Sequence, residues 1–346
     1  MYFAQRFTDI NQDDIVKRMT EMSISGEMTT YDKLTSIWWA SRNGYLTVLE
    51  WLFNNGVSFD PSYSNNSCRV TCIAAENGHL DVVKFLIEKG DDVHNYIGNS
   101  PHTYIGNAII NASMKGHLDI VKFLVNLRDK KEGFLLDWGI DSLIGASKGE
   151  HFEVIKYLIE YGVDIHVKDD QALAEAANNG RLDIVEYLLG KGANINIDDL
   201  VNNALAISSS KGHFDMVKFL IKQGADIHIR DDLAIRWASE NGHLEVVKIL
   251  VSEGADIHAQ RDFPICWASR KGHIKVVKYL VEEGANIHVQ SNYALRKASE
   301  NGHLEVVKYL IEKGADVHAL NDQALSRASL FGHQKVVEFF VENEVD

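Results

Sequence analysis

The sequence predicts an all-α fold, a solenoid of about ten helix-turn-helix repeats with short extended hairpin connections. Three observations predict it. Stretches such as WASENGHLEVVKILVSEGADIHA and KASENGHLEVVKYLIEKGADVHA recur along the 346 residues. Ten units share a glycine register that is broken once, by a glutamate, and the last units repeat every 30 residues. After each glycine, apolar residues follow at the spacing of an α-helix.

The glycine register separates the two helices of each repeat. Its ten positions are Gly44, Gly78, Gly116, Glu150, Gly180, Gly212, Gly242, Gly272, Gly302 and Gly332. Glycine supplies the left-handed residue at which two antiparallel helices can meet. A left-handed Glu150 would cost about 1–2 kcal/mol, so the change Glu150→Gly is expected to stabilise the protein unless the neighbouring Gly149 relieves the strain.

The outer helix follows this glycine, and a second glycine comes twelve residues after the first in eight of the ten repeats. In one repeat the apolar positions are Leu304, Val306, Val307, Leu310 and Ile311. A shorter inner helix, such as LAIRWASEN, precedes the first glycine. Aspartate or asparagine opens it and is expected to cap it by accepting from a backbone N–H, which is worth about 1 kcal/mol. This column holds Asp170, Asn202, Asp232, Asp262, Asn292 and Asp322.

These repeats resemble the ankyrin family over roughly residues 36–346. The segment GHLEVVKYLIEKGADVHA matches the second half of that family's repeat. The first half departs from it, because Ala294, Leu295 and Arg296 stand where the family usually has a Thr-Pro-Leu-His start. The repeat is also about three residues shorter than the usual 33, which implies a trimmed hairpin. Units of this length are similar to the ankyrin arrays encoded by giant DNA viruses of amoebae.

Two kinds of segment lie outside the regular repeat. Residues 1–35 lack its glycines and are expected to be an N-terminal capping segment with a helix around 12–22, because an end repeat needs a cover. The alternative is a docking motif for a ubiquitin-ligase component. Longer connections at 95–107 and 128–141 contain aromatic residues, including Phe134 and Trp138, so they are candidate contact surfaces. Their aromatic side chains could equally pack back on the array.

Composition limits the kind of partner. The chain has 49 acidic and 35 basic residues and a net charge of -14, which disfavours binding to nucleic acid phosphates. No apolar stretch approaches the length of a membrane span, and the start MYFAQRFTDINQDD does not read as a secretory signal. Three cysteines, an odd number, favour a reducing compartment. We expect a soluble, cytoplasmic protein, in the host cytoplasm if it is viral, with no nucleic acid or membrane partner.

The histidines do not indicate catalysis or metal binding. Of the 15, eight follow the first glycine register and six lie in the extended stretch, which leaves only His102. The resemblance implies structural hydrogen bonds near the turn for the first set. Cys68 and Cys72 lack a second pair of metal ligands and are expected in the core. No phosphate-binding loop, nucleophile elbow or zinc-protease motif occurs, so the sequence predicts no enzyme activity, no cofactor and no metal.

Asn196 is a candidate modification site. It lies in GANINI, at the position where ankyrin repeats resemble one another in bearing an asparagine that an iron-dependent oxygenase hydroxylates. The resemblance therefore implies hydroxylation at Asn196.

The resemblance also implies that partner proteins bind the hairpin tips and the concave face of the inner helices. Tryptophan and arginine are frequent interface hot spots, although Trp237 and Trp267 could instead pack in the core. The inner-helix positions that vary between repeats are Arg236, Trp237, Glu240, Asn241, Cys266, Trp267, Arg270, Lys271, Arg296, Lys297, Glu300 and Asn301.

The predicted function is a non-catalytic protein–protein interaction scaffold, viral and directed at host proteins. The alternative is a substrate adaptor for a host ubiquitin ligase, with residues 1–35 as its docking motif. Arg270, Lys271, Arg296 and Lys297 form a predicted basic patch, which favours an acidic partner surface. A monomer is expected, with weak end-to-end self-association through the apolar last repeat as a further hypothesis.

Overall fold

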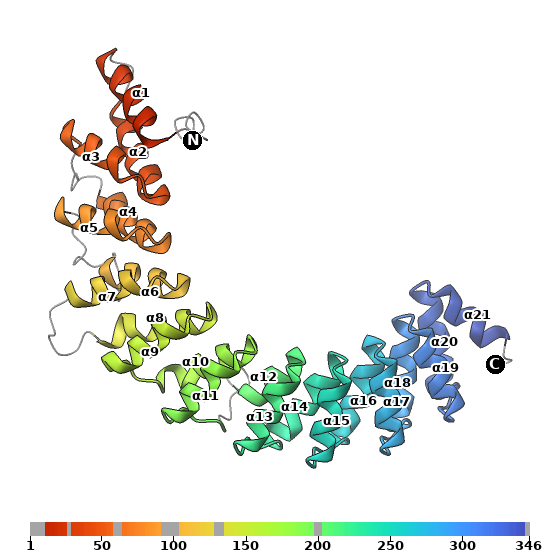
Figure 1. Cartoon of the computed structure of the whole chain (residues 1–346). Coiled ribbons are helices and arrows are strands. Elements are labelled where there is room, and N and C mark those ends of the chain that lie inside the picture. Colours follow the sequence, from red (N-terminus) through yellow and green to blue (C-terminus); the bar gives the residue numbers. More distant parts are fainter. Residues whose placement is uncertain are drawn as a thin grey trace. The chain divides into compact units, whose positions relative to one another are not determined.

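The structure is a computed structural model that describes residues 11–25, 29–57, 64–90, 104–127, 135–196 and 203–342. All regular secondary structure within these ranges is helical, as the predicted fold class requires (Figure 1). The chain forms two compact units, Met1–Ala172 and Leu173–Asp346. Each unit is a stack of repeats built from one inner and one outer helix.

The inner helices are α2 (Thr30–Asn43), α4 (Ser64–Glu76), α6 (Tyr104–Lys115), α8 (Leu135–Lys148), α10 (Val167–Asn178), α12 (Ala204–Lys211), α14 (Ile229–Glu240), α16 (Ala259–Lys271), α18 (Val289–Glu300) and α20 (Ala319–Leu330). The outer helices are α3 (Leu46–Asn54), α5 (Leu80–Glu88), α7 (Leu118–Leu127), α9 (Phe152–Tyr161), α11 (Leu182–Gly190), α13 (Phe214–Lys222), α15 (Leu244–Ser252), α17 (Ile274–Glu282), α19 (Leu304–Glu312) and α21 (Gln334–Glu342).

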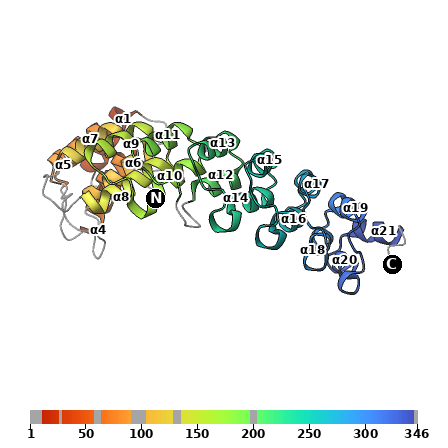
Figure 2. The same ribbon diagram turned by 90° about the horizontal axis from the view of Figure 1, so that it is seen from below.

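Most inner helices pack on a neighbouring inner helix and contact the outer helix of their own repeat. In the second unit α12, α14, α16, α18 and α20 follow one another in this way, with the outer helices in a parallel row (Figure 2). The core comes from apolar columns of both the inner and the outer helices, such as Ile235 of α14. Val246, Val247 and Leu250, for example, are at most 1% exposed, and the following repeats bury the same positions.

The glycine register is left-handed, as the sequence predicts. Its φ values run from 72° at Gly180 to 83° at Gly78, and Glu150 also has a left-handed φ, of 64°. Gly149, beside it, has no left-handed φ, so the strain stays at the glutamate.

Five of the described connections are shorter than a hairpin. In place of an extended segment, three consecutive residues such as Arg230, Asp231 and Asp232 are left-handed, with φ near 54°. The right-handed part of α14 therefore begins only after Asp232. The same turn recurs at 168–170, 260–262, 290–292 and 320–322. It is the local structure that a repeat of 30 residues uses where a longer hairpin would not fit.

The expected capping by the aspartate and asparagine column is wrong for the repeats from Asp232 to Asn292. Asp232 Oδ1 accepts from the backbone N–H of Asp256, 3.0 Å away in the next repeat, and not from its own helix. Asp262 and Asn292 accept in the same way from Asn286 and Asp316, at 3.1 and 2.9 Å. The reason is the left-handed backbone, since an N-cap residue normally has extended dihedrals. These side chains link successive repeats.

A histidine adds to each of these links. The Nδ1 of His228 donates to Asp232 Oδ1 at 3.0 Å, and the carboxylate is 9% exposed. The backbone N–H of His228 in turn donates to Asp226 Oδ1 at 2.9 Å. Corresponding His-to-Asp or His-to-Asn bonds occur at 166–170, 258–262, 288–292 and 318–322. Five of the six histidines of the extended stretch are thus structural, and the sixth, His94, lies outside the described residues.

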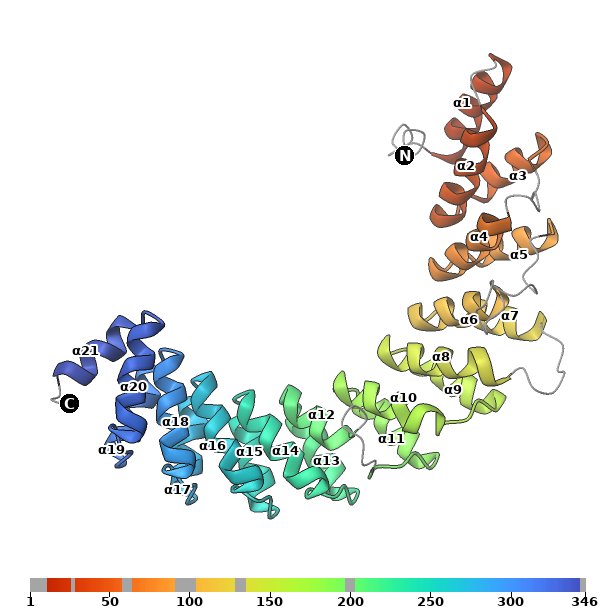
Figure 3. The same ribbon diagram turned by 180° about the vertical axis from the view of Figure 1, so that it is seen from behind.

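Helix α1 (Gln12–Ile24) covers the outer helix of the first repeat (Figure 3). Ile15 and Met19 are fully buried, and Thr47 of α3 donates to Gln12 at 3.1 Å. The role of residues 1–35 as a capping segment stays a prediction.

The two long connections fall mainly outside the described residues, at 91–103 and 128–134. Their C-terminal parts are not loops, because residues 104–107 begin α6 and residues 135–141 begin α8. Trp138 is 2% exposed and lies 6.3 Å from the ring of Tyr161, so this aromatic side chain packs back on the array. Phe134 lies outside the described residues.

Replacing Glu150 by glycine is expected to raise the free energy of unfolding by about 1 kcal/mol, because glycine adopts the left-handed φ of 64° without strain. Urea unfolding of the wild type and the variant measures the change. A lower or unchanged stability would contradict the assignment of strain to this turn.

Candidate protein-binding surface

In eight of the ten repeats an imidazole fixes the repeat to the preceding one. The Nε2 of His273, at the start of the outer helix α17, donates to the carbonyl of Glu240 at 2.9 Å, in the last turn of α14. The ring also lies against Gly242, where a Cβ would be only 2.5 Å from Nδ1. The full set of pairs is His79–Arg42, His117–Glu76, His151–Met114, His213–Asn178, His243–Ser210, His273–Glu240, His303–Arg270 and His333–Glu300. The first histidine set is therefore structural, as expected.

Two of the predicted binding residues hold the left-handed turn of their own repeat. Arg236 is 7% exposed, and its guanidinium donates to the carbonyls of Arg230 and Asp231 at 2.6 and 2.9 Å. Its third bond goes to Gln260 of the next repeat. Burial lowers the pKa of this guanidinium. Arg236 thus holds the left-handed turn at 230–232 in place.

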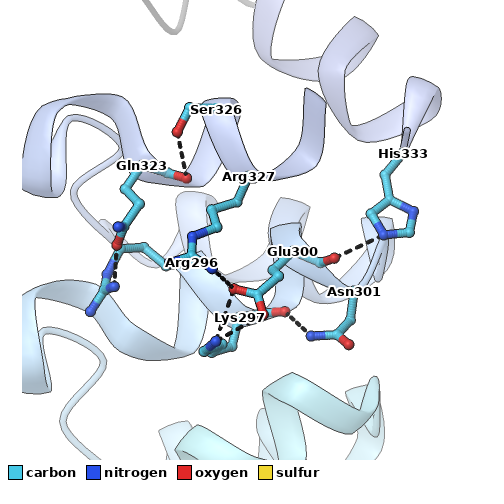
Figure 4. A network of polar contacts seen from close by, with 8 residues as sticks. All are labelled: Arg296, Lys297, Glu300, Asn301, Gln323, Ser326, Arg327 and His333. Carbon is cyan, nitrogen blue, oxygen red and sulfur yellow. Dashed lines mark hydrogen bonds and ion pairs between the residues drawn. The ribbon is translucent and has the colours of Figure 1, made fainter. Parts of the chain in front are cut away.

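Arg296 repeats this arrangement two inner helices further along, on α18. It donates to the carbonyls of Gln290 and Ser291 at 2.8 and 2.9 Å and to the side chain of Gln323 (Figure 4). Burial lowers its pKa as well. The guanidinium of Arg296 is therefore occupied by contacts within the protein and is less available to a partner than its sequence position suggests.

The tryptophans on this face are partly exposed. Trp267 stacks on Phe263 with ring centroids 5.0 Å apart, and the guanidinium of Arg270 lies 4.4 Å from the centroid of the Trp267 ring. Trp237 occupies the same position in α14. Neither ring is fully enclosed. One part of each tryptophan side chain packs against the protein, and the exposed part is available for contact with a partner.

A carboxylate lies among the cations at the C-terminal end of this face (Figure 4). Lys297 Nζ donates to both oxygens of Glu300 at 2.9 and 2.8 Å, and Arg327 of α20 donates to Glu300 at 2.9 Å. Burial raises the pKa of Glu300, but the bond from Lys297 and the charges of Lys297, Arg327 and Arg270 outweigh it, so the pKa is lowered. Glu300 is ionised and shared between two inner helices.

The remaining predicted residues have weaker contacts. Lys271 Nζ lies 3.9 Å from the Glu240 carboxylate, and both side chains are partly exposed. Asn241 donates to the carbonyl of Trp237 at 2.9 Å, and Asn301 donates to that of Lys297 at 2.8 Å. Asn241, Lys271 and Asn301 thus lie at the C-terminal ends of their inner helices.

Arg327 is a residue of this face that the sequence prediction omitted. It is the fourth member of the column that holds Trp237, Trp267 and Lys297 at intervals of 30 residues. That register was the signal that could have identified it.

Asn196 bridges two repeats. Its Nδ2 donates to the carbonyl of Gly224 at 3.2 Å, and its Oδ1 accepts from the N–H of Asp226 at 2.8 Å. Its side-chain amide is thus engaged on both sides, although the residue is exposed. Hydroxylation there stays a prediction.

The described ranges contain no group of three or more histidine, cysteine or acidic side chains arranged to bind a metal ion. Cys266 is buried, and burial raises the pKa of its thiol to about 12, which keeps it protonated at neutral pH. The side chain of Cys68 lies outside the described residues, and Cys72 is half-buried. None of the described helices is long and apolar enough to span a bilayer.

The last repeat exposes apolar side chains. Leu330 and Phe331 are 76% and 54% exposed. Polar or charged residues occupy the corresponding positions in the two preceding repeats, as Arg270, Lys271, Glu300 and Asn301. End-to-end self-association through this surface stays a prediction.

The chain matches the family described as ankyrin repeats (3 copies) over residues 1–97, 74–169, 109–199, 143–231, 173–261, 205–291 and 265–346. It is also 30% identical over 172 residues to the ankyrin repeat and KH domain-containing protein mask-1 of Caenorhabditis elegans, covering 47% of this chain and 6% of that protein. A second such protein, CBG24701 of Caenorhabditis briggsae, is 30% identical over 161 residues, or 46% of this chain and 6% of that protein. The chain thus spans a small part of the length of these relatives.

Stability is expected to fall when the pH drops below 6.5, the ordinary pKa of histidine, partly because of His273. Burial lowers the pKa of His273 in the folded state, so the unfolded chain takes up a proton first as the pH falls. This contribution is complete above pH 6.5 and is lost towards the lowered pKa. His273→Gln keeps an N–H donor without the titration, and urea unfolding between about pH 7.5 and 5 should show a shallower pH dependence. An identical slope would argue against this origin.

Proposed function

Because the chain belongs to the ankyrin-repeat family, we propose that it is a non-catalytic scaffold that binds partner proteins through the exposed face of its inner helices. Ankyrin repeats are in general modules of protein–protein interaction. The finer assignment, to the inner helices of the second unit, comes from the arrangement of side chains on α14, α16, α18 and α20.

One observation carries this assignment. The residues that hold the repeats together, namely the register glycines, the histidines and the Asp or Asn column, stay nearly constant along the second unit. Next to them, positions 237, 267, 297 and 327 change from tryptophan to lysine and arginine, although all four have the same place in the repeat. The recurring links through the glycines, the histidines and the Asp or Asn column do not use these four positions, so recognition is the better explanation of the change. Large aromatic and arginine side chains on a rigid framework suit a binding site.

The contacts narrow the surface to fewer residues than the sequence predicts. Arg236 and Arg296 donate to carbonyls of their own turns and are left out of the proposed surface. Trp237, Trp267 and Arg270 remain as its centre.

Two other parts of the sequence prediction remain proposals. From the resemblance to viral arrays alone, we propose that the partners are host proteins in the cytoplasm. The ubiquitin-ligase adaptor is the weaker proposal, because α1 uses Ile15 and Met19 to cover α3 and so has a structural purpose.

Replacing both Trp237 and Trp267 by alanine is expected to reduce recovery of partner proteins by about tenfold or more, because hot-spot residues typically contribute at least about 2 kcal/mol each. The measurement is affinity purification of the tagged full chain from expressing cells, with quantitative mass spectrometry. Arg270→Glu, which leaves both rings in place, should reduce the same partners.

The matched control is Tyr279→Ala, which removes a half-buried aromatic residue from the outer helix α17. It should leave partner recovery unchanged at similar thermal stability. Equal recovery with the wild type, the tryptophan variant and Arg270→Glu would contradict the proposed surface.

A further inference from the structure

The inner helices of the second unit present a face whose chemistry changes along the stack. Positions separated by four residues lie on one side of a helix. In α14 and α16 these positions hold Leu233 with Trp237 and Phe263 with Trp267. In α18 and α20 they hold Tyr293 with Lys297 and Gln323 with Arg327. Because α14, α16, α18 and α20 pack side by side in this order, an aromatic half adjoins a cationic half.

The aromatic half is apolar but not closed. Phe263 and Trp267 are stacked 5.0 Å apart and are each partly exposed, and Trp237 on the neighbouring helix is also partly exposed. The guanidinium of Arg270 covers one side of the Trp267 ring. An apolar side chain of a partner could therefore cover the remaining aromatic surface of these two helices.

The cationic half has an excess of positive charge. Lys297 and Arg327 both contact Glu300, and Arg270 also acts on the Glu300 carboxylate. One negative charge thus stands against three positive charges. The side chain of Arg327 is 38% exposed and that of Lys297 19%, so a carboxylate from outside can reach them beside Glu300. An ion pair between a partner carboxylate and Lys297 or Arg327 is stronger when it is partly buried, and added salt weakens it.

From this juxtaposition we infer that the partner contributes an extended peptide segment with an apolar anchor for α14 and α16 and acidic residues for α18 and α20. The inference rests on the proposed function, because it uses the same face, and it adds the chemistry of the partner. Packed helices lie about 8–10 Å apart and an extended chain advances about 3.3 Å per residue, so one repeat corresponds to about three residues. The acidic residues should follow or precede the anchor by about three to six residues.

The test begins with a displayed library of random peptides of about 12 residues, long enough to cross four repeats when extended. Selection is on the full chain. We expect the enriched peptides to share an apolar or aromatic residue and, at the stated spacing, one or more aspartates or glutamates. Enriched peptides without this acidic preference would overturn the inference, and so would a library that yields no enriched peptide.

The second step measures the affinity of the enriched peptides by fluorescence anisotropy. The variant Lys297→Gln with Arg327→Gln should raise Kd by about tenfold, and added salt should weaken wild-type binding more than binding to the variant. The control, Lys248→Gln with Lys308→Gln, removes two lysines that also face a glutamate three residues away, but on the outer helices. It should change Kd by less than about twofold. Thermal unfolding checks that each variant is folded.

The outcomes separate this inference from the proposed function. Binding that is lost in Trp237→Ala with Trp267→Ala but unchanged in the lysine and arginine variant overturns the acidic requirement and leaves the proposed surface in place. Binding that neither variant changes contradicts both. If the library yields nothing, the co-purification experiment still decides the proposed function.

Discussion

The imidazole at the start of an outer helix is the contact on which the order of the array depends. It donates to a carbonyl in the last turn of the preceding inner helix, as His273 does to Glu240. It also occupies the space above the register glycine, so that Gly242 has no room for a Cβ. Glycine therefore meets two requirements at one position, a left-handed backbone and a close approach by the next repeat. A side chain at Gly242 would therefore meet both backbone strain and a clash with His273.

Fixing the repeats in this way leaves the inner helices free to vary. The recurring links between repeats use the register glycine, the histidines and the Asp or Asn column, and none of these lies at positions 237, 267, 297 or 327. Substitutions in that column change what the surface can bind and leave the recurring links intact, although Arg327 adds a contact of its own to Glu300 of the preceding repeat. In a scaffold of this kind, the recurring residues between neighbouring repeats determine the stability, and the variable column determines the binding specificity.

Much of the fold could be predicted from the sequence, because a 30-residue period with fixed glycines determines where helices begin and end. The left-handed glycines and the structural histidines follow from the same pattern. The capping expected of Asp232 was wrong, because the sequence does not reveal that three successive residues, 230–232, are left-handed. That turn directs the carboxylate to the next repeat.

The candidate site was predicted only in part for a related reason. Arg236 and Arg296 have the composition of interface residues, but the carbonyls that they satisfy exist only because of the left-handed turn. Arg327 was omitted although it shares a column with Trp267, because the sequence alone does not show that it reaches Glu300 across two helices. The contacts of an arginine depend on backbone geometry more than on its position in a repeat.

The most direct test of this account compares Gly242→Ala with Gly284→Ala by urea unfolding. Both glycines are left-handed, with φ of 81° and 101°, but only a Cβ at 242 would meet an imidazole, because nothing lies within 4 Å of one at 284. Both changes should therefore cost about 1–2 kcal/mol of backbone strain, and Gly242→Ala should cost about 1–3 kcal/mol more. That excess should largely disappear in a background that carries His273→Ala. Equal losses at the two glycines, or an excess that persists without the imidazole, would contradict the claim that this contact orders the repeats.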